Sequence, residues 1–448
     1  MCASAIMTAL GQINVKTTFL SNEFRGSAPY IDAHRGCTFV IYVEGEAFES
    51  PCEALIQDLA LLHTLGVKLV LVFGCQPQAE AALATSGHPL RKHCGRWIVD
   101  QQGMNAIAAQ TQLLRMMIEA RFSVGLPNTP LHGLDIVTAS GNLVMARPFG
   151  VRDGVDGLYA GDVRHVRSDA IRELLARDML VIIPPIGYSS TGELFDLDAT
   201  EVASHVAIAM QADKLILLGQ HDGVCNEDGL LEHQMEPEQA RALSNATMPE
   251  ALRHQLEAAC LAACKGVKRA HLLNWNDRDA LLGELFTRDG MGTMITQERY
   301  EQLRTATNTD IAGLMELLRP LEERQILVPR SRERLEQQIS DYTVIDRDGM
   351  TIGCAALHGY PQDECGELAC VAVHEGYRDG ERGTRLLEAI ERKARRQGLR
   401  QLFALTTHTS HWFLEHGFVP AGIDQLPEAR RSAYNTQRNS KVLVKPLV

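Results

Sequence analysis

The sequence predicts an α/β protein in which a domain built on a largely parallel sheet is followed by a smaller α/β domain. Over residues 21–296, short apolar segments alternate with amphipathic helical segments, an order typical of a parallel sheet covered by helices on both faces. From residue 304 onward the order changes to helices, a hairpin, and then strands separated by helices. With 448 residues, the chain is long enough for two or three domains of ordinary size.

Composition and charge narrow the class of protein. The formal net charge is −12, which argues against non-specific binding to nucleic acid. No uncharged apolar run approaches the roughly 20 residues of a membrane span. Residues 1–20 lack a basic segment followed by a long apolar core, so we expect an N-terminal extension rather than a signal peptide. We therefore expect a cytoplasmic protein with neither a nucleic-acid nor a membrane partner.

The eleven cysteines include no CxxC pair, and free thiols of a cytoplasmic protein explain them better than disulfides do. His408, His411 and His416 lie close together in the sequence, but without partners at a recognised metal-ligand spacing. The sequence therefore predicts no metal site.

The first domain, 21–296, is expected to begin with a short helix over residues 23–36 and to continue as alternating strands and helices. Residues 53–65 form an amphipathic pattern with leucines along one side. Five short apolar segments are predicted as strands: 38–42, 67–73, 179–183, 214–218 and 270–273.

Residues 297–303 show no packing pattern and are expected to be a linker to the second domain, 304–448. The expected elements of that domain are helices near 311–320 and 331–339, a hairpin of strands 342–345 and 351–357, a strand 368–373, a helix 384–397, a strand 402–406 and a helix 411–416.

The segment between strand 368–373 and the following helix is the candidate ligand loop. It reads Arg-Asp-Gly-Glu-Arg-Gly-Thr over residues 378–384. Successive backbone N–H groups that open onto a helix N-terminus suit a pyrophosphate, because fixed donors and the helix dipole both favour negative charge. Taken alone, the loop is equally consistent with an ordinary strand-to-helix turn.

This stretch resembles motif A of the GNAT acetyltransferases, whose loop reads Arg/Gln-x-x-Gly-x-Gly/Ala and cradles the pyrophosphate of acetyl-CoA. Arg378 and Gly383 match the pattern, whereas Glu381 stands at the middle glycine and Gly380 lies one place early. The resemblance implies that acetyl-CoA is the cosubstrate. The residues expected to bind it are Val371, Ala372, Val373, Arg378, Asp379, Gly380, Glu381, Arg382, Gly383 and Thr384.

The order of elements in the second domain is also that of a GNAT domain, and WFLEHGF resembles the aromatic–Gly-Phe signature of that family. The resemblance implies that N–H groups of Val371 and Val373 take the acetyl carbonyl and the pantetheine. Glu367, at the start of the strand, is placed to act as the general base, although a strand-end surface glutamate is the alternative. Thr406, at the end of the next strand, is the hydroxyl available to the leaving sulfur.

The first domain resembles the amino-acid kinase family over about residues 25–296, on the segments GVKLVLVFGCQPQ, TGELFDLDATEVASHVAIAMQADKLILLGQHDGV and HLLNWNDRDALLGELFTRDGMGTMI. Phosphoryl transfer needs cations and N–H donors around the phosphate. The resemblance places Tyr42 at the lysine of the family's first loop and Glu44 at one of its glycines. We therefore expect a catalytically inactive kinase fold.

More narrowly, the first domain resembles the arginine-pathway acetylglutamate members of that family. In arginine-inhibited relatives, arginine sits between the N-terminal helix and the end of the kinase domain. The resemblance therefore implies an allosteric arginine site, and also a hexameric ring joined through the N-terminal helix. The residues expected to bind arginine are Tyr30, His271, Glu284, Gly290 and Gly292; the alternative is an ordinary helix charge beside a core histidine.

Together, the two domains resemble the fused bacterial N-acetylglutamate synthases. The resemblance implies direct acetyl transfer from acetyl-CoA to L-glutamate, the first step of arginine biosynthesis, with feedback inhibition by L-arginine. Bidentate arginines suit the two carboxylates of glutamate, and the expected contacts are Arg330, Arg430, Arg438 and Ser440. Arg431 is an alternative to Arg430. A bifunctional synthase–kinase and a non-catalytic arginine-responsive protein remain the rival functions.

Overall fold

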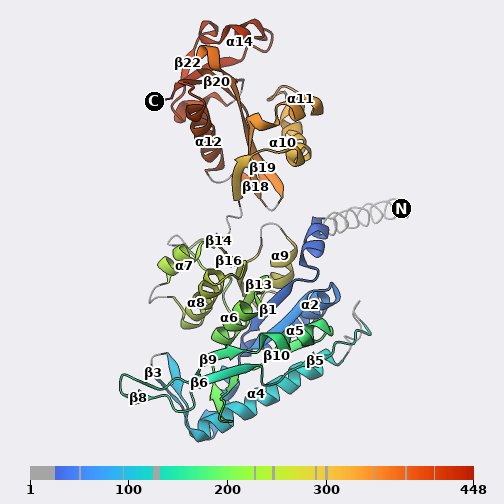
Figure 1. The fold of residues 1–448 in the computed structure, drawn as a ribbon, viewed down its shortest axis with the longest axis vertical. Helices are drawn as coiled ribbons and strands as arrows, with labels where there is room; N and C mark the ends of the chain where they lie inside the picture. The colour runs from blue at the N-terminus through green and yellow to red at the C-terminus, as the bar shows by residue number, and fades with distance from the viewer. Residues whose placement is uncertain are drawn as a thin grey trace, which may run out of the picture. The chain divides into compact units, whose positions relative to one another are not determined.

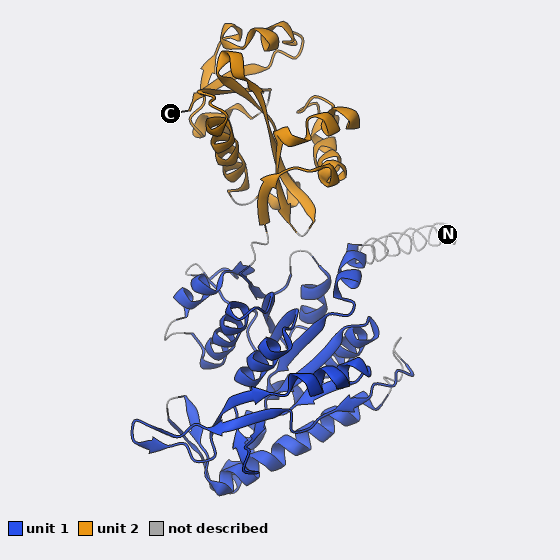
Figure 2. Cartoon of the chain, viewed as in Figure 1, with its two compact units in different colours: residues 1–298 blue, residues 299–448 orange. Residues whose placement is uncertain are grey.

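In a computed structural model, the chain divides into two compact units, Met1–Glu298 and Arg299–Val448, coloured blue and orange in Figure 2. The structure describes residues 26–49, 52–93, 95–124, 132–226, 229–244, 248–287, 290–297, 301–347, 349–378, 381–407 and 409–447. The expected N-terminal extension, residues 1–20, lies outside them. None of the helices formed by the described residues is long and apolar enough to cross a membrane.

The first unit is a three-layered α/β/α sandwich around a mostly parallel sheet (Figure 1). In spatial order its strands are β14 (Gln234–Met235), β16 (Thr293–Ile295), β15 (Arg269–Asn274), β13 (Lys214–Gly219), β1 (Thr38–Val43), β2 (Lys68–Phe73), β10 (Leu180–Ile183) and β5 (Thr138–Ala139). The strands predicted from the five apolar segments form the centre of this sheet and pair in parallel, which confirms the predicted fold class.

The central strands are apolar throughout because their alternate side chains enter two different cores. On β1, Val40 packs into one core and Ile41 into the other. The helices of the first core are α5 (Ser168–Ala176), α6 (Ala199–Met210), α7 (Pro237–Leu243) and α8 (Glu250–Cys264). Those of the second are α2 (Glu53–Thr64), α3 (Gln76–Thr85), α4 (Gln101–Phe122) and α9 (Ala280–Phe286).

The first unit also contains short strands that the sequence patterns did not predict. A four-stranded sheet has the order β12 (Leu194–Asp196), β11 (Ile186–Tyr188), β6 (Val144–Pro148) and β9 (Gly161–Val166). Two hairpins pair β3 (Arg91–His93) with β4 (Arg96–Ile98), and β7 (Val151–Arg152) with β8 (Val155–Asp156). The helix expected over 23–36 occupies residues 26–34 of the described chain.

The second unit is built on one mixed sheet. Its strands, in spatial order, are β17 (Glu301–Thr305), β18 (Tyr342–Arg347), β19 (Met350–Tyr360), β20 (Cys365–Val373), β21 (Gln401–Thr406), β23 (Lys441–Pro446) and β22 (Val419–Ala421). Its helices are α10 (Ile311–Glu323), α11 (Arg332–Gln337), α12 (Arg382–Arg396), α13 (Ser410–Glu415) and α14 (Glu428–Ser432).

The prediction that residues 297–303 form a linker is wrong for residues 301–303. Residues 301–303 belong to β17, which pairs antiparallel with β18, and the boundary between the two units falls at 298/299. Sequence patterns missed this strand because its five residues, EQLRT, are mostly polar. Arg304 of β17 fixes the strand to its surroundings, because its guanidinium donates hydrogen bonds to Asp310 at 2.7 Å and to Asp346 at 2.7 Å.

The packing of the four-stranded sheet β12-β11-β6-β9, the small sheet, predicts the effect of one substitution on the free energy of unfolding. A Cβ at Gly187 in β11 would lie 2.5 Å from the Cβ of Ala146 and 2.8 Å from the side chain of Leu197. Since alanine has no rotamer to move aside, Gly187→Ala should lower the free energy of unfolding of the first unit by about 2 kcal/mol. Thermal unfolding followed by circular dichroism measures this. Gly141→Ala, where a Cβ meets nothing within 4 Å, is the matched control, and equal midpoints would contradict the prediction.

Candidate functional site

The sheet of the second unit opens between β20 and β21. These parallel strands pair over three residues only, ending at Glu367 and Phe403. Beyond that point β20 remains paired with β19, and β21 with β23. Backbone groups on the open edge of β20 are therefore available to a ligand. Glu367 lies where the opening begins and is 8% exposed.

A bulge follows Glu367 in β20. The register with β19 shifts between Cys354 and Ala356, and Cys370 has a φ of +53°, a conformation that non-glycine residues rarely adopt. Val371 and Val373 are half-buried on either side of buried Ala372. Nothing in the run LACVAV signals the bulge, because apolar β-branched residues suit a regular strand equally well.

The candidate phosphate loop leads from β20 into α12. Arg378 is half-exposed, and its guanidinium donates to Glu375 at 3.3 Å. Asp379 and Gly380 lie outside the described residues. Glu381 occupies the N-cap position of α12, is exposed, and makes no side-chain capping hydrogen bond. The glutamate that departs from the loop pattern therefore lies at the helix start rather than in the core.

Arg382 has a structural contact that sequence reasoning missed. Its Nε donates to Glu301 of β17 at 3.0 Å, and its Nη1 donates to the carbonyl of Tyr377 at 3.2 Å. Arg385 also donates to Glu301, at 3.0 Å. The Arg382 side chain therefore ties α12 to the sheet, while its backbone belongs to the first turn of the helix.

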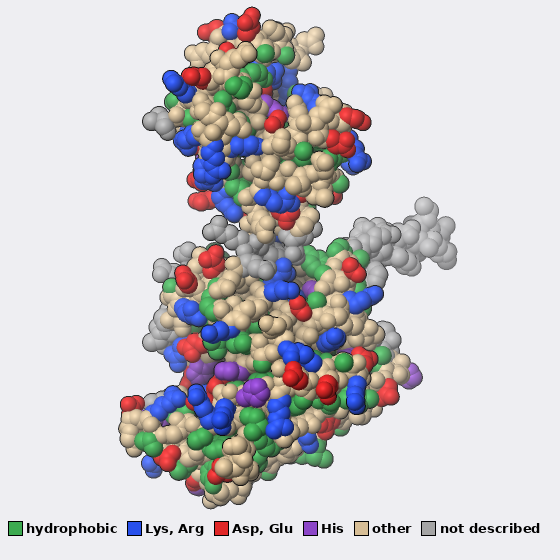
Figure 3. Space-filling model, viewed as in Figure 1, with side chains coloured by type: hydrophobic (Ala, Val, Ile, Leu, Met, Phe, Trp, Pro, Cys, Tyr) green, Lys and Arg blue, Asp and Glu red, His purple; other side chains and the backbone are tan. Residues whose placement is uncertain are grey.

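The aromatic segment expected after the last catalytic strand packs against the start of α12. A Cβ at Gly383 would lie 3.2 Å from the ring of Trp412, so glycine permits this close approach. Thr384 and the Nε2 of His416 are hydrogen-bonded at 2.9 Å, and the rings of His416 and Trp412 lie 4.3 Å apart. Figure 3 shows that Lys and Arg side chains gather on the second unit around α12.

Glu367 is bound on both carboxylate oxygens by Arg430 of α14. The Nε of Arg430 donates to Oε2 at 2.8 Å and its Nη2 donates to Oε1 at 3.0 Å. Burial alone would lower the pKa of Arg430, but the hydrogen bonds and charge of Glu367 raise it. Two residues predicted separately, as a base and as a substrate contact, are thus partners of one another.

Arg330 lies close enough to Cys370 of β20 for its charge to act on that thiol. Burial raises the pKa of the Cys370 thiol, and the nearby charge of Arg330 opposes that rise. The Nη1 of Arg330 donates to the carbonyl of Val328 at 2.9 Å. Its Nε is buried, with no hydrogen-bond partner among the described residues, so it retains a donor for an anionic group.

The other residues predicted to contact the substrate form hydrogen bonds through or to backbone groups of the protein. The Nη2 of Arg438 donates to the carbonyl of Ile326, and Ser440 accepts the Tyr434 hydroxyl through its backbone carbonyl at 2.7 Å. Arg431, the alternative to Arg430, donates to the carbonyl of Leu426 at 3.1 Å. Among the residues predicted to contact the substrate, Arg430 is the only one with a described hydrogen bond to Glu367.

Thr406 ends β21 and is 8% exposed. Its hydroxyl accepts the backbone N–H of Thr409 at 3.1 Å and lies 3.1 Å from the Thr409 hydroxyl. A hydroxyl that accepts one hydrogen bond can still donate its own hydrogen. The geometry therefore leaves Thr406 able to act as a donor at the end of the strand.

A second cluster lies in the first unit, where β15 meets α9. The Nδ1 of His271 and Oε1 of Glu284 are 2.6 Å apart, and Oε2 of Glu284 accepts the N–H groups of Met291 and Gly292 at 2.6 and 3.0 Å. Burial raises the pKa of Glu284, but the hydrogen bond and charge of His271 outweigh it and lower it to about 2. Gly290, with a φ of +68°, lies against the same carboxylate.

The N-terminal helix packs beside this cluster. His34 contacts the carbonyl of Leu285 through Nε2 at 2.8 Å, and burial lowers the pKa of His34 to about 4. The ring of Tyr30 lies 6.5 Å from that of His34. Three of the predicted arginine-binding residues, His271, Gly290 and Gly292, therefore lie around the fourth, Glu284, and the helix that carries Tyr30 adjoins α9.

A cavity of about 280 Å³ lies in the first unit at the ends of β1 and β2. The basic residues that line it are Lys92 and Arg96. The acidic residues that line it are more numerous: Glu44, Glu46, Glu80, Asp196, Asp198 and Glu250. Tyr42 and Glu44 are 7% and 6% exposed. Gln255 and Trp275 donate to Glu44 at 3.0 and 3.4 Å. Such a lining would repel a polyphosphate.

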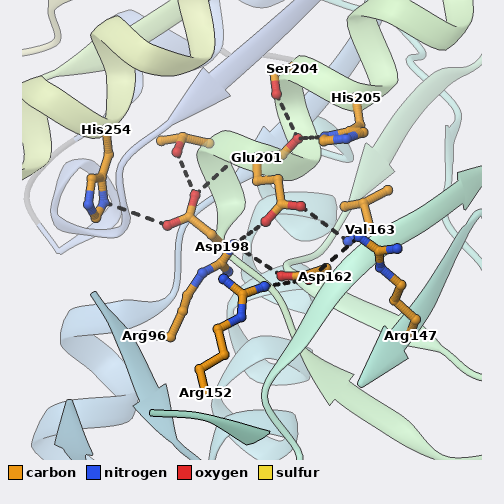
Figure 4. A network of polar contacts seen from close by, with 11 residues as sticks. Arg96, Arg147, Arg152, Asp162, Val163, Asp198, Glu201, Ser204, His205 and His254 are labelled. Atoms are coloured by element: carbon orange, nitrogen blue, oxygen red, sulfur yellow. Dashed lines mark hydrogen bonds and ion pairs between the residues drawn. The ribbon is translucent and has the colours of Figure 1, made fainter. Parts of the chain in front are cut away.

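Arg96, which lines this cavity, belongs to a network of ion pairs and hydrogen bonds (Figure 4). Its guanidinium bonds to Glu201 of α6 and lies 3.8 Å from Asp162. Asp198 caps α6 by accepting the N–H of Glu201 at 2.9 Å, and lies 3.7 Å from His254. The positive charge of Arg96 is therefore shared among carboxylates of the protein itself.

Comparison with protein families divides the chain at the same place as the fold does. The Amino acid kinase family matches residues 38–274, and the Acetyltransferase (GNAT) family matches residues 311–418. Each match falls within one of the two compact units.

Relatives and solved structures extend over nearly the whole chain. An amino-acid acetyltransferase from Pseudomonas fluorescens is 47% identical over 427 residues, covering 95% of this chain and 99% of the relative. One from Pectobacterium carotovorum is 44% identical over 435 residues, covering 96% and 99%. The crystal structure of N-acetylglutamate synthase from Neisseria gonorrhoeae complexed with coenzyme A and L-arginine is similar at 38% identity and a TM-score of 0.85, covering 95% and 99%. The same enzyme with coenzyme A and N-acetyl-glutamate gives a TM-score of 0.60 at the same identity, covering 96% and 99%.

The buried Glu44 yields a pH-dependent prediction. Burial raises its pKa to about 7, whereas the unfolded chain loses this proton near pH ~4.3. Stability should therefore fall as the pH rises through this interval, with the full penalty present above pH ~7. Glu44→Gln removes the penalty, so its unfolding free energy should exceed that of the unaltered chain by roughly 1–3 kcal/mol at pH ~8 and match it near pH ~4.

Thermal unfolding of both chains across this pH range measures the difference. Glu173→Gln, at an exposed position of α5, controls for the loss of one negative charge. A difference between Glu44→Gln and the unaltered chain that does not change with pH would contradict the prediction.

Proposed function

Because the chain belongs to the amino-acid acetyltransferases, with an amino-acid kinase-like unit ahead of a GNAT unit, we propose that it transfers an acetyl group from acetyl-CoA to the α-amino group of L-glutamate. The products are N-acetyl-L-glutamate and CoA. The observation that carries this proposal is the contact of Arg430 with Glu367 at the opening of the sheet, with the charges of Arg330 and Glu367 both acting on Cys370 of the same strand. A proton acceptor and two cations suit an amine that carries two carboxylates.

Bound coenzyme A and N-acetyl-glutamate in the 38%-identical Neisseria enzyme support the same pair of substrates. Acetyl-CoA supplies an activated thioester. We assign its binding to the open edge of β20 at Val371 and Val373 and to the loop and first turn of α12, where N–H groups favour a pyrophosphate. We assign to the Thr406 hydroxyl, which accepts the N–H of Thr409, the role of hydrogen-bond donor to the leaving sulfur. Attack by the amine is direct, without an acetyl-enzyme.

The role of Glu367 is tested by substitution. Glu367→Gln keeps the size of the side chain but removes the proton acceptor, so kcat should fall by roughly 10²–10⁴-fold. CoA released from acetyl-CoA and L-glutamate, measured with a thiol reagent, gives the rate. Glu364→Gln changes the exposed glutamate three residues earlier and should retain activity. A Glu367→Gln enzyme with unchanged kcat would refute the assignment.

We further propose that this reaction is the first step of arginine biosynthesis and that L-arginine inhibits it through the first unit. The buried cluster of His271, Glu284 and Gly292 beside the N-terminal helix supports this site. L-arginine in the Neisseria structure supports the same ligand. The acid-lined cavity supports the further proposal that the kinase-like unit transfers no phosphoryl group.

L-Arginine should suppress glutamate-dependent CoA release, and Glu284→Gln should weaken that inhibition by at least about tenfold, because a neutral amide loses the charge that attracts a guanidinium. Glu173→Gln on α5 is the control and should leave inhibition unchanged. The arginine-induced rise in melting temperature of each variant reports binding separately from activity. An enzyme that ignores arginine would refute the sensor while leaving the acetyltransferase proposal intact.

A further inference from the structure

The proposed general base is engaged by the protein itself. Both carboxylate oxygens of Glu367 accept hydrogen bonds from Arg430, at 2.8 and 3.0 Å, in a bidentate ion pair. The two side chains are 11% and 25% exposed, so solvent screens the pair only partly. A guanidinium that binds both oxygens stabilises the charged carboxylate and occupies directions from which an ammonium would approach. In this arrangement both oxygens of Glu367 already accept a hydrogen bond from the protein itself.

Among the described residues, the Arg430 side chain has few partners other than Glu367. It belongs to α14, a helix of five residues of which none is buried. Within the described part of the chain, its remaining amino group, Nη1, makes only a long contact of 3.4 Å with the carbonyl of Ala433. The segment is anchored just before the helix by Leu426, which is 2% exposed and packs into a core with Phe403. Releasing Glu367 would therefore leave the packing of the segment intact.

A substrate with a carboxylate on its side chain is the natural competitor for Arg430. Such a carboxylate offers the guanidinium the same bidentate geometry that Glu367 offers. Arg330, whose buried Nε has no hydrogen-bond partner among the described residues, is available to the second carboxylate of an acidic amino acid. The site therefore holds one cation that is already paired with the base and one that retains a donor.

We propose that Arg430 is a carboxylate-operated latch on Glu367, an inference that rests on the proposed function. When the side-chain carboxylate of the substrate takes the guanidinium, Glu367 is released at the position where the α-ammonium must lose its proton. One proton passes from the substrate nitrogen to Glu367, and the free amine then attacks the thioester carbonyl. The C–N bond forms as the C–S bond breaks, and CoA leaves as the thiol with the second proton that the nitrogen loses. Substrate selection is thereby exerted on the chemical step as well as on binding.

L-Glutamine tests the latch, because it has the shape of L-glutamate but a neutral side chain that competes poorly for a guanidinium. In the unaltered enzyme, kcat with glutamine should be at least about 100-fold below kcat with glutamate, since the base stays paired. In Arg430→Gln the base is unpaired. KM for glutamate should then rise, while kcat with glutamine should increase at least about tenfold over the unaltered enzyme.

Arg400→Gln is the matched control, because it also removes an Arg–Glu pair of the second unit, but an exposed one with Glu364. Arg400→Gln should leave both kcat values unchanged. If Arg430→Gln fails to fold, as judged by its melting temperature, Arg430→Lys replaces it and should give an intermediate rise in kcat with glutamine. A kcat with glutamine that stays the same or falls in a folded Arg430 variant overturns the latch.

Glutamate binding to Glu367→Gln provides an independent readout. Without its competitor, Arg430 should bind the substrate carboxylate more readily, so the Kd for L-glutamate, measured by calorimetry in the presence of CoA, should fall by roughly tenfold. If Glu367 does not compete with the substrate for Arg430, the substitution will leave the Kd for L-glutamate unchanged, and that result would overturn the proposal. Failure of the unaltered enzyme to release CoA with glutamate would instead refute the proposed function.

Discussion

The arrangement of the second unit depends on the separation of two parallel strands. β20 and β21 pair over three residues and then diverge, because each keeps its other neighbour, β19 or β23, along its remaining length. Unpaired backbone groups are costly when buried, so an open edge in the middle of a sheet persists only where water or a ligand reaches it. The proposed base, the bulge at Cys370 and the start of α12 all lie along this opening.

Charge on the second unit is balanced by partners within the chain. Glu301 is held by Arg382 and Arg385, and Glu367 by Arg430. The first ties α12 to the edge strand, a structural role. The second joins two groups that the proposed reaction needs separately. Because a half-buried ion pair is only modestly stabilising, a substrate carboxylate of the right geometry can compete with it.

The buried carboxylates of the first unit fall into two groups whose pKa values are shifted in opposite directions. Glu284 accepts hydrogen bonds from His271 and from two backbone N–H groups, and these hold its pKa near 2 against the effect of burial. Glu44 and Asp196 lack comparable compensation, and burial raises the pKa of each to about 7. The first arrangement keeps a fixed negative charge beside the N-terminal helix. The second leaves an acidic cavity where a phosphoryl-transfer enzyme would need cations.

The sequence by itself determined the fold class, the central strands of the first unit and most of the elements that lead into and out of β20, because apolar periodicity reports local burial directly. It also identified Glu367, Arg430, His271 and Glu284 as residues of interest. It missed β17 and the small sheet, whose short or polar strands are defined by their partners rather than by their own composition. Only the tertiary structure decided that Arg430 lies on Glu367, 63 residues away in the chain, because no local pattern encodes which distant charges meet.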